Sequence, residues 1–176
     1  AVRLMILPEA LRLSSRKVTL STAGQVDLIK KFQGENLHIN LAISLNATDN
    51  KTRGDIMPIN KKYPIEDLME CLRSYPLKPS RRLTFEYVLL RGVNDRDEDA
   101  VRLAKLLRGI PCKVNLIPFN KFTPSIFEQP SEERIHAFQE YLLSKNHTVF
   151  IRRNRATDIS GACGQLAVQP FSHSPA

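Results

Sequence analysis

Residues 82–109 read RLTFEYVLLRGVNDRDEDAVRLAKLLRG. Residues 82–90 are almost continuously apolar, which is typical of a strand that is buried on both faces of a parallel sheet. The remainder has the pattern of an amphipathic helix, with Asn94 or Asp95 as its expected N-cap, acids in its first turn and Gly109 at its end. A buried strand that leads into such a helix predicts a right-handed crossover to a neighbouring parallel strand.

The same alternation of strand and helix runs through the whole chain. We expect further strands at residues 17–22, 37–45, 112–119 and 148–153. We expect further helices at residues 2–13, 24–32, 64–75 and 130–146, with Ser131 as the N-cap of the last, and a turn of helix at 49–56. The sequence therefore predicts an α/β fold built on a parallel sheet.

Composition restricts the class of protein. A chain of 176 residues with 42% hydrophobic residues can form one domain with a real core. The net charge of +8 favours a polyanionic partner such as a nucleic acid. No apolar run is long enough to span a membrane, and the charges of Arg3, Glu9 and Arg12 argue against a signal peptide. We therefore expect no membrane partner.

The cysteines indicate a reducing compartment. The chain has three of them, Cys71, Cys112 and Cys163, with no CxxC spacing. An odd number without close spacing argues against a disulfide framework and against a complete zinc or iron–sulfur site within the chain. We expect Cys71 and Cys112 to be core residues. Cys163 is different, because it lies between Ala162 and Gly164 in the stretch TDISGACGQL.

Polar side chains follow one expected strand after another. They are Ser21, Thr22, Ser44, Asn46, Arg91, Asn94 and Asn120. Any one of them alone is best explained as a helix cap or turn former. Because the carboxyl ends of parallel strands meet at one edge, the set predicts a ligand-binding mouth there. Within one strand, Glu86 and Tyr87 leave two interpretations open: an inward carboxylate that contacts a cofactor, or a structural pair.

Several motifs carry a family resemblance. They are RKVTLSTAG at 16–24, LAISLNA at 41–47, MPINKKYPI at 57–65, FEYVLLRGVND at 85–95, PCKVNLIPFN at 111–120 and TDISGACGQL at 157–166. In this order they resemble the RlmN/Cfr family of radical S-adenosylmethionine (SAM) methyltransferases, which modify adenosine in ribosomal RNA. The resemblance covers residues 1–168, with residues 169–176 as a tail, and it implies a partial TIM-like radical SAM barrel that lacks its amino-terminal strands.

The resemblance also implies a set of site residues. Residues Ser21, Ser44, Leu45, Asn46 and Asn120 would bind SAM, although the family more usually has His at the position of Asn46. Cys163 would accept the methyl group from SAM and carry it to the RNA. The arginines of the run before it, Arg152, Arg153 and Arg155, would contact RNA phosphates and could lower the pKa of the Cys163 thiol.

The family's [4Fe–4S] cluster motif and its second catalytic cysteine lie upstream of these blocks. The resemblance therefore places the cluster ligands outside this chain, and we expect the chain to be inactive as it stands. The RlmN branch, which methylates adenine C2 in 23S rRNA and tRNA in the cytoplasm, is favoured. The alternatives are a Cfr-type C8 methyltransferase, a non-catalytic RNA-binding module and a radical SAM enzyme that acts on a small molecule. The sequence indicates no oligomeric state.

Overall fold

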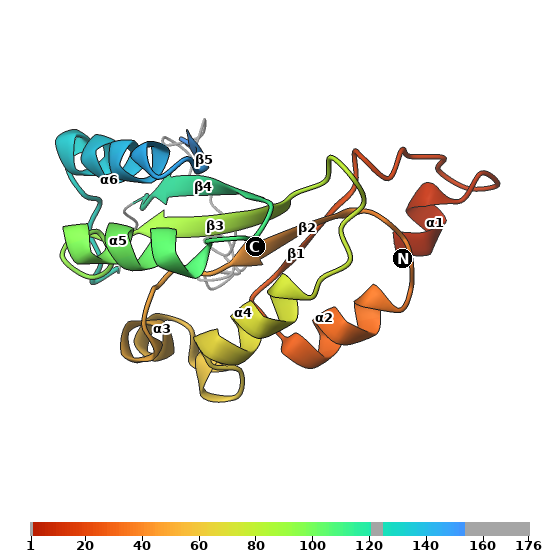
Figure 1. Ribbon diagram of the computed structural model, residues 1–176, viewed down its shortest axis with the longest axis horizontal. Helices are drawn as coiled ribbons and strands as arrows, with labels where there is room; N and C mark the ends of the chain where they lie inside the picture. Colours follow the sequence, from red (N-terminus) through yellow and green to blue (C-terminus); the bar gives the residue numbers. More distant parts are fainter. Residues whose placement is uncertain (1, 121–124, 154–176) are drawn as a thin grey trace, which may run out of the picture.

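The computed structural model describes residues 2–120 and 125–153 (Figure 1). Its centre is one five-stranded sheet in which every neighbouring pair is parallel and the strand order follows the chain. The strands are β1 (Thr19–Thr22), β2 (Asn40–Ser44), β3 (Leu83–Leu89), β4 (Cys112–Pro118) and β5 (Thr148–Ile151). The predicted α/β fold with a parallel sheet is thus confirmed.

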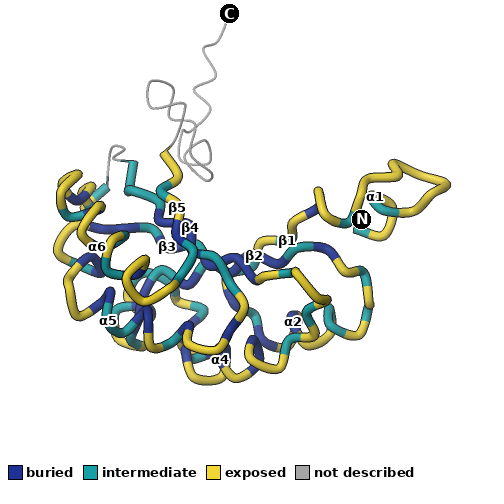
Figure 2. The backbone as a smooth tube through the Cα atoms, turned by 45° about the horizontal axis from the view of Figure 1, so that its top comes forward, coloured by how far each residue is buried: buried dark blue, intermediate teal, exposed yellow. Residues whose placement is uncertain are grey.

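The helices that carry buried apolar residues cover one face of this sheet (Figure 1). They are α2 (Val26–Gln33), α4 (Ile65–Arg73), α5 (Asp97–Leu106) and α6 (Glu132–Ser144). Two short elements follow β2 at its carboxyl end, α3 (Asn50–Ile56) and the 3₁₀ helix η1 (Pro58–Lys61). Figure 2 shows that the segment with α1 (Val2–Ile6) extends away from this body, and α1 buries no residue.

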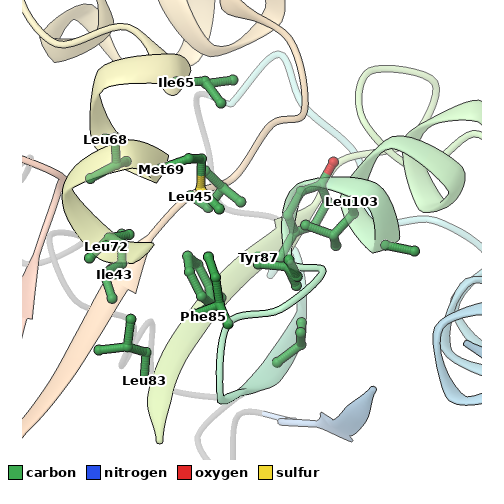
Figure 3. Packing of buried hydrophobic residues seen from close by; sticks show 14 of the residues in the cluster. Ile43, Leu45, Ile65, Leu68, Met69, Leu72, Leu83, Phe85, Tyr87 and Leu103 are labelled. Carbon is green, nitrogen blue, oxygen red and sulfur yellow. The ribbon is translucent and has the colours of Figure 1, made fainter. Parts of the chain in front are cut away.

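Successive side chains of β3 lie on two faces of the sheet that differ in chemistry. Leu83, Phe85, Tyr87 and Leu89 are all fully buried and pack in the core under the helices (Figure 3). Successive side chains of a strand point to opposite faces, so Thr84, Glu86 and Val88 lie on the other face. Glu86 and Val88 are only half-buried. Since Thr84 is buried, the expectation of burial on both faces holds at the amino end of β3 and fails at Glu86 and Val88, and the second face carries polar groups.

Two helix boundaries differ from those predicted. The amino-terminal helix ends at Ile6 instead of residue 13, because Leu7 precedes Pro8 and a proline disfavours helical backbone in the residue before it. Helix α5 has Arg96 as its N-cap instead of Asn94 or Asp95. The Asp99 carboxylate accepts a hydrogen bond from the Arg96 backbone N–H at 3.2 Å.

Other helix ends agree with the sequence more closely. Ser131 is the N-cap of α6, as predicted, and its hydroxyl accepts a hydrogen bond from the Arg134 backbone N–H at 3.2 Å. Gly109 lies beyond the last residue of α5, Leu106, and has a φ of +79°. A glycine adopts this left-handed backbone without the steric cost that a side chain would bring.

Two cysteines lie in the described part of the chain, and both are free thiols. Cys71 is 3% exposed within the core, and Cys112 packs against that core, so both are core residues as expected. Burial raises the pKa of Cys112 to about 11, although the positive charge of Arg82 acts in the opposite direction. Among the described residues, no helix is long and apolar enough to cross a bilayer.

We predict that Cys112 resists alkylation in the folded protein. A thiol with a pKa of about 11 is only about one part in a thousand thiolate at pH 8, and the thiolate is the form that reacts. Iodoacetamide at pH 8 should therefore label Cys112 slowly in the native protein and rapidly in urea, as measured by mass spectrometry of the peptide. Equal labelling rates in the two states would contradict this assignment.

Candidate functional site

The polar face of the sheet carries a row of three side chains from three neighbouring strands. Ser44 of β2 is in register with Glu86 of β3, which is in register with Asn115 of β4. Neighbouring strands lie about 4.8 Å apart, so the hydroxyl, carboxylate and amide lie side by side. Asn115 was not predicted as a site residue. The sequence signal for Asn115 is its place between Val114 and Leu116, which are both fully buried in the core, so that Asn115 lies on the opposite face of β4.

Glu86 and Tyr87 do not pair with each other, because they lie on opposite faces of β3. The Tyr87 hydroxyl donates a hydrogen bond to the Asn94 carbonyl oxygen at 2.9 Å. Burial, with a further contribution from the negative charge of Asp99, raises the pKa of Tyr87 well above its ordinary value. The Glu86 carboxylate forms an ion pair with Arg152 at 3.5 Å and keeps 21% of its side chain exposed. Glu86 thus presents a carboxylate to the polar face.

Asn94 joins the loops that follow β2 and β3. It is fully buried, and its side-chain nitrogen donates to the carbonyl oxygens of Asn46 and Val88, both at 2.7 Å. Its side-chain oxygen accepts from the Leu90 backbone N–H, also at 2.7 Å. An amide that satisfies backbone groups on both sides cannot also cap a helix. This explains why α5 begins later than predicted and why Asn94 is a structural residue of the edge.

Asn46 occupies a backbone conformation that few residues tolerate. Its φ is +58°, in the left-handed region where asparagine is enriched among non-glycine residues. Its side-chain oxygen accepts from the Val88 backbone N–H at 3.0 Å, and its side-chain nitrogen donates to the Met57 sulfur at 3.4 Å. The side chain therefore continues the pairing of β2 and β3 beyond the last residue of β2.

A second anchor, Arg53 of α3, was missed by the sequence analysis. Its guanidinium donates to the backbone carbonyl oxygens of Ala23 at 2.8 Å, Leu45 at 3.1 Å and Tyr63 at 3.3 Å. It also donates to the Asn60 side-chain oxygen at 3.0 Å. Arg53 is fully buried, and among the described residues it forms no ion pair with a carboxylate. Arg53 thereby fixes the segments after β1 and β2 relative to each other.

Gly24 makes room for this guanidinium. A Cβ atom at Gly24 would lie 3.0 Å from Nη2 of Arg53 and 2.9 Å from Cδ2 of Leu68. Its φ of +95° is also one that residues with a side chain rarely adopt. Burial lowers the pKa of Arg53, but an arginine in a protein stays protonated. The segment after β1 is thus shaped around a buried cation whose donors are satisfied by neutral oxygens.

A third set of contacts fastens helix α5 to the segment after β2. The Thr48 hydroxyl donates to the Asp99 carboxylate at 2.9 Å, and Arg102 donates to the Thr48 hydroxyl at 3.0 Å. Arg102 also forms an ion pair with Asp99 at 2.5 Å. Asp99 is 2% exposed, so its charge is compensated locally. The carboxyl edge of the sheet is therefore held by three polar anchors that leave little freedom to its backbone.

The predicted SAM-binding residues lie along this edge in different environments. Ser21 is exposed on β1 and Ser44 is half-buried at the end of β2. Leu45 has a fully buried side chain, and its N–H donates to the Glu86 carbonyl oxygen at 3.0 Å. Asn120 is half-buried just after β4. Strands β1 and β4 are three strands apart, and the register sets Ser21 level with Ala42, Thr84 and Lys113, so Asn120 lies further along the strand direction than Ser21.

The predicted RNA-contacting arginines are only partly within the described residues. Arg152 follows β5 and pairs with Glu86. Arg153 holds the Glu132 carboxylate of α6 with two hydrogen bonds of 3.1 and 2.6 Å. Arg155 and Cys163 lie outside the described residues, as does the tail from 169 to 176. Among the described residues, no group of three His, Cys, Asp or Glu side chains could hold a metal ion.

Comparison with known proteins identifies the family. No protein-family model matches the chain. The dual-specificity RNA methyltransferase RlmN of Syntrophotalea carbinolica is 50% identical over 166 residues, which cover 94% of this chain and 44% of the relative. RlmN of an Anaeromyxobacter species is 52% identical over 169 residues, which cover 96% and 45%. The chain belongs to the RlmN/Cfr family. It spans a little under half the length of these relatives and matches their carboxyl-terminal part.

Solved structures agree with this assignment to the RlmN/Cfr family. A crystal structure of a radical SAM methyltransferase from Sphaerobacter thermophilus superposes with a TM-score of 0.87 at 42% identity, covering 93% of this chain and 48% of that one. A domain of pyruvate-formate lyase-activating enzyme from Bacteroides vulgatus has a TM-score of 0.59 at 16% identity, covering 76% and 80%. The second likeness concerns the fold alone.

We predict that replacing Arg53 by leucine destabilises the intact protein by about 3 kcal/mol or more. The change leaves the carbonyl oxygens of Leu45 and Tyr63 and the side-chain oxygen of Asn60 buried without their donor, and each buried unsatisfied group costs about 1–3 kcal/mol. Urea unfolding measures the loss. The control is Lys31→Leu at an exposed position of α2, which should change stability by less than about 0.5 kcal/mol. A similar small change for Arg53→Leu would refute its anchoring role.

Proposed function

We propose that the chain is part of a radical SAM methyltransferase that modifies C2 of an adenosine in 23S rRNA and in tRNA. The observation that carries this proposal is about 50% identity, over nearly the whole chain, to proteins named dual-specificity RNA methyltransferase RlmN. The net charge of +8 suits an RNA substrate, and such substrates place the enzyme in the cytoplasm. The names of the relatives favour C2 over the C8 chemistry of the Cfr branch.

The carboxyl edge fits SAM chemically. The ribose and adenine of SAM need neutral hydrogen-bonding groups, which Ser21, Ser44, Asn120 and the backbone from 44 to 46 provide. The sulfonium and ammonium groups of SAM are positive, and Glu86 presents a partly exposed carboxylate in register with Ser44. The side-chain oxygen of Asn46 already accepts a hydrogen bond from the Val88 N–H. We therefore propose that Asn46 shapes the backbone of the mouth and does not bind SAM through this oxygen. Together with a [4Fe–4S] cluster whose ligands we place outside this chain, bound SAM supplies a methyl group and a radical.

In this proposal Cys163 accepts the methyl group. Its thiolate sulfur forms a bond to the methyl carbon, and the bond from that carbon to the sulfonium sulfur breaks with its electron pair, so that a neutral thioether leaves. Positive side chains beside the thiol favour the thiolate, and Arg152 and Arg153 precede Cys163 closely in sequence. The cysteine then holds the methyl group as a thioether until its transfer to the adenine, which must leave its stack to be modified.

The arginines that we assign to RNA phosphates have partners already. Arg153 binds Glu132 and Arg152 binds Glu86, each through an exposed guanidinium. Exposed ion pairs of this kind are worth at most about 1 kcal/mol, so an RNA phosphate can displace the carboxylate at little cost. Arg155 completes the proposed set from outside the described residues.

A non-catalytic RNA-binding module is the second candidate. It is favoured by the net charge of +8, which suits RNA whether or not the RNA is modified. The two functions differ in a single readout, since the module binds RNA without methylating it.

We predict that Cys163→Ala in the intact enzyme abolishes adenosine methylation, because the thioether intermediate cannot form. Mass spectrometry of nucleosides from digested rRNA and tRNA measures the product and separates methylation at C2 from methylation at C8. Cys112→Ser is the matched control and should retain activity, since Cys112 packs against the core below the helices. Retained methylation in the Cys163→Ala variant would exclude the proposed methyl transfer.

We also predict that Glu86→Gln weakens SAM binding about tenfold or more with little effect on stability. Hydrogen bonds to charged groups contribute about 1.5–3 kcal/mol, whereas the ion pair lost with Arg152 is a long one at 3.5 Å. Isothermal titration of the intact protein with SAM measures the dissociation constant. Glu132→Gln, which also removes a carboxylate that pairs with an arginine, is the control. Equal SAM affinity in the two variants would show that Glu86 does not face the cofactor.

A further inference from the structure

A basic hollow lies on the polar face of the sheet, toward the amino ends of the strands and next to the row of Ser44, Glu86 and Asn115. It has a volume of about 380 Å³ and is lined by residues near the amino ends of β1 to β4. Four of its lining residues are cationic: Arg16, Arg81, Arg82 and Lys113. The others are neutral, namely Thr19, Asn40, Ser80 and Thr84. No carboxylate is among the described residues that line it.

The two neighbouring arginines bind only neutral oxygens among the described residues. Arg81 donates to the Asn40 side-chain oxygen at 2.7 Å and to the His38 carbonyl oxygen at 3.3 Å. Arg82 donates to the Thr148 hydroxyl at 3.0 Å. These bonds hold the guanidinium groups in place but leave their charges without a counter-charge. The hollow is thus a preorganised concentration of positive potential.

The other two cations, Arg16 and Lys113, have fewer partners than the two arginines. Within the described ranges, 2–120 and 125–153, neither the Arg16 nor the Lys113 side chain forms a hydrogen bond or an ion pair. Lys113 is in register with Thr84 on one side and Thr148 on the other, so its sheet neighbours are neutral. Like charges gathered around one hollow repel one another, and an anion in the hollow removes that repulsion.

We propose that this hollow binds a backbone phosphate of the substrate RNA, an inference that rests on the proposed function. Guanidinium groups match the geometry of phosphate oxygens, and hydroxyls such as those of Thr19 and Ser80 are common phosphate ligands. Thr19 and Ser80 are exposed, as are Arg16 and Arg82 on either side of them, so a phosphate on a large polymer can reach them.

The position of the hollow determines what such a contact can do. Along β3, Thr84 of the hollow lies two residues before Glu86 and five before Leu89 at the carboxyl end of the strand, which is about 7 and 17 Å at about 3.3 Å per residue. A phosphate held there is displaced toward the amino ends of the strands, away from the carboxyl edge where the proposed mouth opens. The contact therefore contributes to RNA affinity and to the register of the RNA on the protein, and leaves the chemical step unchanged.

A second basic hollow provides the matched control. It lies between α5 and α6 and is lined by Lys105, Arg108 and Lys145, among other residues. Helices α5 and α6 both end beside it, at Leu106 and Ser144. Cations at the carboxyl end of a helix are stabilised by the helix dipole, so the charges of this second hollow have a partner within the fold.

The test compares two double variants of the intact protein that each remove one arginine and one lysine. The first is Arg16→Gln with Lys113→Gln, and the second is Arg108→Gln with Lys105→Gln. The ligand is an RNA hairpin that carries the target adenosine. We expect the first variant to bind the hairpin at least tenfold more weakly and to lower the salt dependence of log K by about 0.7–0.9, which is the contribution of one phosphate contact. The second variant should bind like the unmodified protein.

Three further measurements distinguish a phosphate site from a structural role of the same cations. The first variant should keep its kcat at saturating RNA, its SAM affinity and its melting temperature. Unchanged RNA affinity, or an equal loss in both variants, overturns the proposal. Unchanged RNA affinity with a shifted melting temperature would assign the hollow to an acidic segment of the protein itself. If the unmodified protein binds the hairpin but does not methylate it, the proposed function fails while the phosphate site stands or falls on the binding data alone.

Discussion

The architecture of the candidate site depends on one buried cation. The Arg53 guanidinium connects the segment after β1, the segment after β2 and the region around η1 through backbone carbonyl oxygens. A charge in such a place is costly unless every donor finds an acceptor. Here the acceptors are mostly main-chain groups, so the guanidinium specifies the path of the backbone itself. Because Ser44, Leu45 and Asn46 lie on that path, the position of Arg53 determines the shape of the proposed cofactor mouth.

Asn94 has the same kind of role one strand further along the sheet. Its amide takes up carbonyl and N–H groups that the ends of β2 and β3 would otherwise leave unsatisfied. The Tyr87 hydroxyl reaches the Asn94 carbonyl oxygen from the core side. The edge is therefore supported from both directions: by polar anchors within its loops and by an aromatic side chain from the apolar interior. Loops held in this way have a fixed conformation, which is what the proposed cofactor mouth requires.

The sequence predicted the elements well because their signals are local. The apolar run of β3 and the acidic first turn of α5 lie within the stretch 82–109, and strand ends with small polar residues are visible by inspection. Arg53 could not be found in this way, because its partners are mostly backbone oxygens at distant positions, and backbone oxygens carry no sequence signature. Asn94 was assigned to a helix cap, which is a common role of an asparagine before a helix. The polar face was harder to predict, since only the register of three strands shows that Glu86 and Asn115 lie beside Ser44. The roles of Cys163 and Arg155 rest on the family's motifs, because both lie outside the described residues.

Because the two faces of β3 carry different side chains, substitutions on one face can occur independently of the other. Phe85 and Tyr87 determine whether the sheet packs against its helices, while Thr84, Glu86 and Val88 determine what the opposite face can hold. Substitutions on the second face leave the packing of the first intact, so new ligand preferences can arise without loss of the scaffold. The shared fold with an activating-enzyme domain at 16% identity shows that sequences with little identity can form this architecture.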